Sequence, residues 1–157
     1  MKFTEFVCFD ATVTELQAKD RDGAIEELVS AVASAGKIPA GSAKDVAKAV
    51  IKRENEASTG MGKGVGVPHV KHEASKSVVA AVGHSSVGID FAALDEQPVY
   101  SVILLISPVE NPDRHLQAME HIFRHLQKER FRKFLRQCRT PAAVEDLLRE
   151  ADDNPSW

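Results

Sequence analysis

An almost unbroken apolar run, Val99–Ser107, constrains the fold of this chain more than any other feature, because residues 102–106 are all Val, Ile or Leu. The run has the length of a β-strand and is far shorter than the roughly 20 residues of a membrane-spanning helix. A strand that is apolar on both faces is typical of a sheet covered on both sides, as in α/β proteins. A second strand is expected over 77–84.

Helical periodicity flanks these strands in the sequence. The spacing of apolar residues predicts helices over 20–36, 42–57, 111–126, 129–138 and 140–150, with a short strand over 2–9 and a frayed tail over 151–157. Gly36 is a natural helix stop, Ser42 resembles an N-terminal cap that is paired with Asp45, and Asn111 caps the third helix. The order of elements indicates an α/β or α+β fold with a mixed sheet.

Composition limits the class of protein. The 157 residues are 43% apolar and 27% charged, with a net charge of −3, which fits a single domain over 1–157 with a core of about 20–152. Neither nucleic-acid binding nor membrane insertion is indicated. The N-terminus lacks a secretory apolar region, so a cytoplasmic location is expected, with Cys8 and Cys138 reduced.

Four of the nine glycines lie between residues 60 and 66. Their spacing fits neither the dinucleotide-binding fingerprint nor the P-loop, so nucleotide binding is not indicated. The glycines instead provide a backbone that can approach a ligand closely, and Pro68 and His69 follow this segment. The alternative interpretation is a flexible hairpin with a buried histidine.

Two further residues favour an anion site near His69. Arg53 lies on the apolar side of its helix, close to the glycine segment, where a bidentate phosphate contact is one role and an ion pair with Glu54, Glu56 or Asp90 is the other. His115 falls in the first turn of its helix, where the helix dipole attracts anions, although a capping or surface histidine is equally compatible with this position.

The other histidines carry weaker signals. His121 and His125 are four residues apart on a helix, but they lie to the side of its apolar stripe and no third ligand accompanies them, so both are expected to be solvated. His72 and His84 have no partner pattern. A metal protein that uses His69, His72 and His115 is a disfavoured alternative, because carboxylates and cysteines at ligand spacing are absent.

A basic cluster near the C-terminus is expected to be a solvated helix face or a docking surface for an acidic partner. Its members are Arg130, Arg132, Lys133, Arg136 and Arg139.

Taken together, the motifs resemble one family. They are Arg53-Glu54, Ser58-Thr59-Gly60, Gly62, Gly64, Val67-Pro68-His69, Ile89-Asp90-Phe91, Asp95, Pro98-Val99, Pro108 and His115-Leu116. The chain is similar, from about residue 20 to residue 152, to type-2 enzyme IIA domains of the bacterial phosphotransferase system, the mannitol, fructose and nitrogen class.

The resemblance implies a mixed β-sheet with helices on both faces and a phosphoryl relay. The domain would accept a phosphoryl group from phospho-HPr on His69 and pass it to an enzyme IIB, with His115 and Arg53 assisting and with no cofactor or metal. We therefore expect His69 in a partly exposed cleft, with His115 nearby and Arg53 directed toward it. The segment expected to approach the phosphate comprises Ser58, Thr59, Gly60, Gly62 and Gly64.

One position departs from the family pattern. Members usually have glycine directly after the phosphohistidine, and this chain has Val70. A β-branched residue disfavours positive φ and crowds its surroundings, so slow phosphorylation is expected. Together with the lack of IIB, IIC or HPr segments, Val70 supports the alternative of a regulatory protein-binding module of the same fold.

Overall fold

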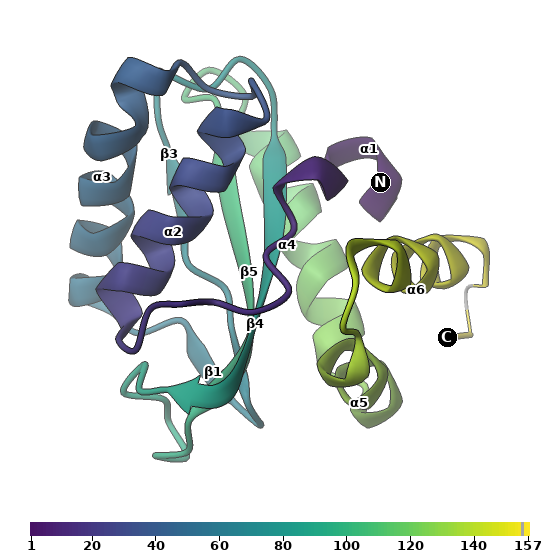
Figure 1. Ribbon diagram of the computed structural model, residues 1–157. Coiled ribbons are helices and arrows are strands. Elements are labelled where there is room, and N and C mark those ends of the chain that lie inside the picture. Colours follow the sequence, from purple (N-terminus) through teal and green to yellow (C-terminus); the bar gives the residue numbers. More distant parts are fainter. Residues whose placement is uncertain (155) are drawn as a thin grey trace.

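The computed structural model describes residues 1–154 and 156–157. Its strands are β1 (Gly60–Gly62), β2 (Val65–Gly66), β3 (His69–Lys71), β4 (Val79–Ile89) and β5 (Val99–Ser107). The predicted apolar strand, β5, is the centre of the sheet (Figure 1). Strands β2 and β3 pair in parallel with successive parts of one edge of β5, and β4 pairs antiparallel with its other edge. The sheet is therefore mixed, as the sequence predicts.

Helices cover both faces of this sheet. They are α1 (Phe3–Phe6), α2 (Arg21–Ser34), α3 (Ala43–Glu56), α4 (Pro112–Leu126), α5 (Glu129–Gln137) and α6 (Pro141–Asp153), with 3-10 turns over Phe9–Ala11 and Ala40–Ser42. Figure 1 shows α2 and α3 on one side of β5, and α4, α5 and α6 on the other. Alternate residues of β5 feed the two cores: Ile103 and Leu105 pack with α4, α5 and α6, whereas Leu104 and Ile106 pack with α2 and α3.

Capping side chains explain where two of the helices begin. The Asp20 carboxylate accepts a 2.7 Å bond from the Gly23 amide at the start of α2. Thr140 caps α6 through the Ala143 amide, at 3.1 Å. The prediction for α3 is wrong in detail: Ser42 makes no side-chain cap bond, because the chain enters this helix through the preceding 3-10 turn.

The N-terminal segment is not a strand over 2–9, contrary to the prediction. Phe3 and Phe6 lie one helical turn apart and are both buried, so helix α1 places both rings in the core. The Asp152 carboxylate accepts bonds from the Phe3 and Thr4 amides, at 2.8 and 3.0 Å. Tertiary contacts with α6 therefore favour the helix.

The C-terminal tail also differs from the prediction. Helix α6 continues to Asp153, and Trp157 is only 4% exposed. The indole ring packs edge-on against Phe131 and Phe134, with the Arg130 guanidinium 4.7 Å from its centre. These aromatic contacts anchor the described end of the chain. Among the described residues, none of the helices is both long and apolar enough to cross a membrane.

The buried face of α4 is the one that carries its histidines. His121 and His125 were expected to be solvated, but they are 9% and 5% exposed. Their rings pack against Phe3, with centroids 4.4 and 4.9 Å away. Another side of α4, which includes Leu116 (60% exposed), faces outward instead. The sequence interpretation failed here because it assigned the inward face from apolar residues alone.

Candidate functional site

His69 lies at the start of β3, directly after a break in the edge of the sheet. Strands β2 and β3 both pair with β5, and Pro68 interrupts this ladder between them because it has no N–H. Its carbonyl still accepts a 3.0 Å bond from the Leu105 amide. The imidazole is half-buried, and its Nδ1 lies 2.8 Å from the Val67 carbonyl oxygen. A carbonyl only accepts hydrogen bonds, so Nδ1 carries the proton and Nε2 keeps a free lone pair.

His115 lies beside His69, in the first turn of α4. The two ring centroids are 5.6 Å apart. His115 is buried, and its Nδ1 lies 2.6 Å from the hydroxyl of Ser107, the last residue of β5. The end of the central strand and the start of α4 thus bring the second histidine to the first.

Both imidazoles are held in the neutral state. Burial is the main cause that lowers the pKa of His115, to about 4, and repulsion from Lys71, and from His69 when that ring is protonated, adds to it. Burial also lowers the pKa of His69, although the bond to the Val67 carbonyl acts in the opposite direction. Near neutral pH the pair therefore offers a nucleophilic nitrogen rather than two imidazolium ions.

Arg53 supplies positive charge to this region from the last turn of α3. Its charge contributes to lowering the pKa of His69, which places the guanidinium within electrostatic reach of the ring. In the part of the chain that the structure describes, Arg53 forms no ion pair with Glu54, Glu56 or Asp90. Its positive charge is therefore not neutralised by these three carboxylates.

Glu54, the neighbour of Arg53, instead organises the segment that follows. Its buried carboxylate accepts bonds from the Thr59 amide and hydroxyl, at 2.6 and 2.7 Å. Ser58 donates its hydroxyl to the Phe91 carbonyl at 2.5 Å. Ser58 and Thr59 therefore use their side chains to hold the loop in place.

The glycines form a hairpin, which was the alternative interpretation of this segment, and they pack against the segment between β4 and β5. A Cβ on Gly60 would lie 2.9 Å from the Cβ of Ala93, and one on Gly62 would lie 3.1 Å from the Asp95 carboxylate. Gly62 and Gly64 also have positive φ, at 88° and 81°. Close packing and turn geometry thus explain these glycines, and their approach to a phosphate stays a prediction.

The structure contradicts the expectation that Val70 crowds the imidazole of His69. Val70 is a strand residue paired with Ile106, and it is not among the residues with positive φ. Its side chain packs with the core beneath α2 and α3, whereas His69 pairs with Leu105, which belongs to the opposite core. Neighbouring strand residues point to opposite faces, so Val70 does not crowd the imidazole.

The remaining histidines lie outside this pair. His72 Nε2 is 2.8 Å from an Asp45 carboxylate oxygen. His84 Nε2 is 3.3 Å from a guanidinium nitrogen of Arg139, and the pKa of His84 is lowered mainly by burial. No group of three or more potential metal ligands is found among residues 1–154 and 156–157.

Two residues of the site were not singled out from the sequence. Ser107 is fully buried and holds His115, and its position as a polar residue at the end of a buried strand was an available signal. Lys71 lies two residues after His69 and lowers the pKa of both histidines. Only the tertiary structure brings Lys71 close enough to His115 for this effect.

Comparisons with known proteins agree with this architecture. Residues 7–151 match the family described as "Phosphoenolpyruvate-dependent sugar phosphotransferase system, EIIA 2". The fructose-specific EIIA component of Haloferax volcanii is 34% identical over 131 residues, which cover 83% of each chain. A nitrogen regulatory protein of Bradyrhizobium diazoefficiens is 29% identical over 148 residues, covering 94% of this chain and 95% of the relative. The fructose-specific EIIABC component of Bacillus subtilis is 29% identical over 152 residues, and this chain spans about a quarter (24%) of its length.

Solved structures share the fold. The nitrogen regulatory protein IIA-Ntr of Neisseria meningitidis superposes with a TM-score of 0.82 at 23% identity, over 92% of this chain and 97% of that one. IIA mannitol of Escherichia coli, in a complex with phosphorylated enzyme IIB mannitol, gives 0.74 at 17% identity, over 90% and 95% of the two chains. The match over nearly the whole sequence and the shared fold show that the chain belongs to the EIIA type-2 family of the phosphoenolpyruvate-dependent sugar phosphotransferase system.

Proposed function

We propose that this chain is a phosphoryl carrier in which Nε2 of His69 accepts a phosphoryl group from a phosphohistidine donor of the HPr type. The observation that carries the proposal is the 2.8 Å bond from His69 Nδ1 to the Val67 carbonyl. It assigns the proton to Nδ1, which leaves Nε2 as the nucleophile. As Nε2 attacks phosphorus, positive charge develops on the ring, and the carbonyl stabilises it through the Nδ1 proton.

The transfer itself exchanges one P–N bond for another. The bond between phosphorus and the donor nitrogen breaks, and the donor nitrogen keeps the electron pair. The bond from phosphorus to His69 Nε2 forms. Such a reaction needs position and charge neutralisation more than covalent chemistry from the protein, and Arg53 and Lys71 supply positive charge on this side of the molecule.

His115 acts on the transferred group rather than on the donor. In this proposal the Ser107 hydroxyl, 2.6 Å away, donates to His115 Nδ1, so that the neutral ring carries its proton on Nε2 and the Nε2–H donates to a phosphoryl oxygen. Its pKa of about 4 keeps this histidine neutral throughout the physiological range. The role of His115 is therefore that of a hydrogen-bond donor.

A protein partner has an apolar surface to dock on beside the site. Leu116 directly follows His115 and is 60% exposed. With Met119 and Phe123 it lines a groove of about 540 Å³ on the outer side of α4. An exposed apolar patch next to a reactive histidine is typical of a protein interaction site. The proposal assigns this surface to the donor and to an enzyme IIB, in the cytoplasm.

A regulatory role is the second candidate. Relatives along nearly the whole chain include proteins named nitrogen regulatory protein. In this role the phosphorylation state of His69 would control the binding of a protein partner, through the charge that the phosphoryl group adds. Val70 no longer favours this role over transport, because its side chain faces away from His69.

Labelled phosphoenolpyruvate with enzyme I and HPr tests the proposal. The wild-type chain should incorporate acid-labile phosphate, His69→Gln should incorporate none, and His115→Gln should be phosphorylated more slowly. His72→Gln is the matched control, since His72 is three residues away and bonded to Asp45. Undiminished labelling of His69→Gln would overturn the assignment, and transfer of the label to an enzyme IIB would favour transport over regulation.

A further inference from the structure

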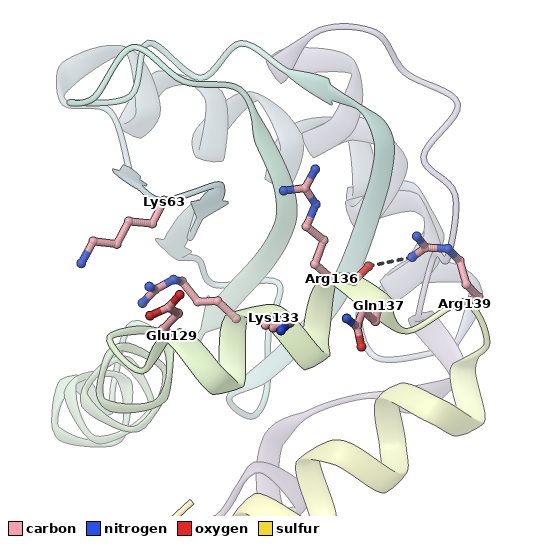
Figure 2. Close-up of a pocket in the computed structure, with 7 residues that line it drawn as sticks. Lys63, Glu129, Lys133, Arg136, Gln137 and Arg139 are labelled. Atoms are coloured by element: carbon pink, nitrogen blue, oxygen red, sulfur yellow. Dashed lines mark hydrogen bonds between the residues drawn. The ribbon is translucent and has the colours of Figure 1, made fainter.

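The structure has a second concave site, which the proposed function does not use. This cationic groove has a volume of about 380 Å³, and it lies between the turn that joins β1 to β2 and the exposed side of α5. Its lining residues are Lys63, Glu129, Arg132, Lys133, Arg136, Gln137 and Arg139. Figure 2 shows Lys63 on one side of the groove and the side chains of α5 on the other. The volume is that of a small-molecule site, since such sites measure about 300–1,000 Å³.

The charge of the groove is opposite to that of the whole chain. Five of its seven side chains are cationic and one is a carboxylate, whereas the net charge of the protein is −3. In the described part of the chain, none of the five cations forms an ion pair with a carboxylate. Uncompensated cations gathered in a concavity produce a local positive potential that attracts an anion.

The arginines are held in place without using all of their donors. Arg132 donates to the Leu126 carbonyl at 2.8 Å, and Arg139 donates to the Arg136 carbonyl at 2.6 Å, the bond drawn in Figure 2. The Arg136 guanidinium stacks 3.7 Å from the centre of the Tyr100 ring. A guanidinium has five N–H donors, so each arginine retains donors for a ligand. Their positions are set before binding, which lowers the entropy cost of binding.

Lys63 is placed at the rim of the groove by an unusual backbone conformation. Its φ is 60°, between Gly62 at 88° and Gly64 at 81°. Glycine would fit this conformation without steric cost, and a lysine in the left-handed region is strained. The Asp95 carboxylate holds the turn by accepting a 2.8 Å bond from the Lys63 amide. Residues in such conformations persist where the surrounding structure fixes them, and they are common at functional sites.

We propose that the cationic groove binds a small molecule with at least two adjacent phosphate groups. The planar fork of a guanidinium matches phosphate oxygens, and three arginines with two lysines exceed what one phosphate can use. An acidic protein is the less favoured occupant, because a stable protein interface covers about 800 Å² on each partner. The cationic groove has the volume of a small-molecule site, so a small ligand can fill it without an interface of that size.

This groove is separate from the pair of histidines. His115 is in the first turn of α4, whereas Arg132 is bonded to Leu126, the last residue of that helix. The eleven residue steps from His115 to Leu126 span about 16 Å at 1.5 Å per residue. A ligand in the cationic groove therefore does not compete with a phosphoryl group on His69, and the two proposals can fail independently.

Calorimetric titration of the full chain with inorganic pyrophosphate, at low ionic strength, tests the proposal. One site per chain is expected. The double variant Lys63→Gln/Lys133→Gln should weaken binding about tenfold, because it removes two charge-assisted contacts. Lys44→Gln/Lys48→Gln is the matched control, since it removes two exposed lysines of α3 and the same net charge. Its affinity should stay within about twofold of wild type.

Competing ligands and the location of binding decide the outcome. Amide chemical shifts should move in α5 and at Lys63, and not at Arg53, His69 and His115. Tighter binding of a nucleoside triphosphate than of pyrophosphate would assign the ligand to nucleotides, and equal affinity would assign it to the diphosphate unit. Tighter binding of a polyglutamate peptide, equal weakening by both double variants, or shifts centred on His69 would overturn the proposal.

Discussion

At the scale of single residues, the chemistry available to His69 depends on the two residues before it. Pro68 lies between the segments of chain that pair with β5 as β2 and β3, and the carbonyl of Val67 accepts the Nδ1 proton of His69. This bond leaves Nε2 as the nitrogen with a free lone pair. The choice of the proposed nucleophilic nitrogen therefore depends on the backbone just before His69.

Arg53 should matter through the shape of its guanidinium as well as through its charge. Replacing it with lysine retains the positive charge near His69 but removes the planar fork. We expect Arg53→Lys to slow phosphorylation of the chain by phospho-HPr at least about tenfold, with an unchanged melting temperature. The measurement is a time course of labelling at equal HPr concentration. Equal rates for the two proteins would make Arg53 a structural residue only.

Val70→Gly should not accelerate the reaction. The valine is an ordinary strand residue whose side chain packs beneath α2 and α3. Its replacement by glycine should lower the free energy of unfolding by about 1–2 kcal/mol and leave the labelling rate within about twofold. Urea unfolding and the same time course measure the two effects. A faster variant of unchanged stability would restore the view that the valine obstructs the donor.

At the scale of elements, α4 connects the candidate site, the core and the proposed partner surface. Its first turn presents His115, its inward face buries His121 and His125, and its outward face exposes Leu116. Inward polar residues on a helix need packing partners, and α1 and α6 provide them. A four-residue helix at the N-terminus is therefore part of what holds α4 against the sheet.

Asp152 is the residue that joins these elements. Its side chain is 2% exposed, and it accepts the Phe3 and Thr4 amides while lying 3.4 Å from His121 Nε2. Asp152→Asn keeps the shape of the side chain, but the new amide nitrogen cannot accept a hydrogen bond. One of the two backbone amides, of Phe3 or Thr4, therefore loses its partner. We expect a loss of about 1–3 kcal/mol in the free energy of unfolding and faster hydrogen exchange at Phe3 and Thr4.

Asp153→Asn is the control for this variant, because Asp153 is the exposed neighbour of Asp152. It removes the same charge without breaking a bond to α1. If the two variants unfold at the same urea concentration, the contacts of Asp152 do not stabilise the N-terminal helix.

At the scale of the whole molecule, the histidines make stability dependent on pH. Burial is the largest cause that lowers the pKa in each of the five affected imidazoles, which are His69, His84, His115, His121 and His125. The unfolded chain therefore binds protons at a higher pH than the folded chain does. Stability must fall as the pH drops below the unfolded pKa of 6.5.

His115 should account for a measurable part of this loss, because its folded pKa is about 4. Between about pH 7 and about pH 5.5 it should cost about 1 kcal/mol of unfolding free energy. His115→Gln should therefore show a shallower decline over this range than wild type, measured by urea unfolding at several pH values. An unchanged pH slope would mean that His115 is not held neutral by burial.

Sequence periodicity predicted the sheet and its covering helices. The apolar run of β5 requires burial on both faces, and the capping residues Asp20 and Thr140 place two helix starts. Local spacing also placed Arg53, His69 and His115 close to the end or start of an element, whereas it was the family resemblance that grouped them as one site. These are features of periodicity and of local hydrogen bonding, which a linear sequence records directly.

Tertiary packing, in contrast, fixes which face each side chain occupies and what it touches. Val70 was expected to crowd His69, but the pairing of β3 with β5 directs it to the other core. His121 and His125 are buried because α1 and the packed Phe3 ring cover them, and the N-terminal segment becomes a helix because Asp152 reaches it from α6. Such contacts join residues up to about 150 positions apart, and their free energy outweighs local preference because burial of a ring or a carboxylate is a property of the assembled fold.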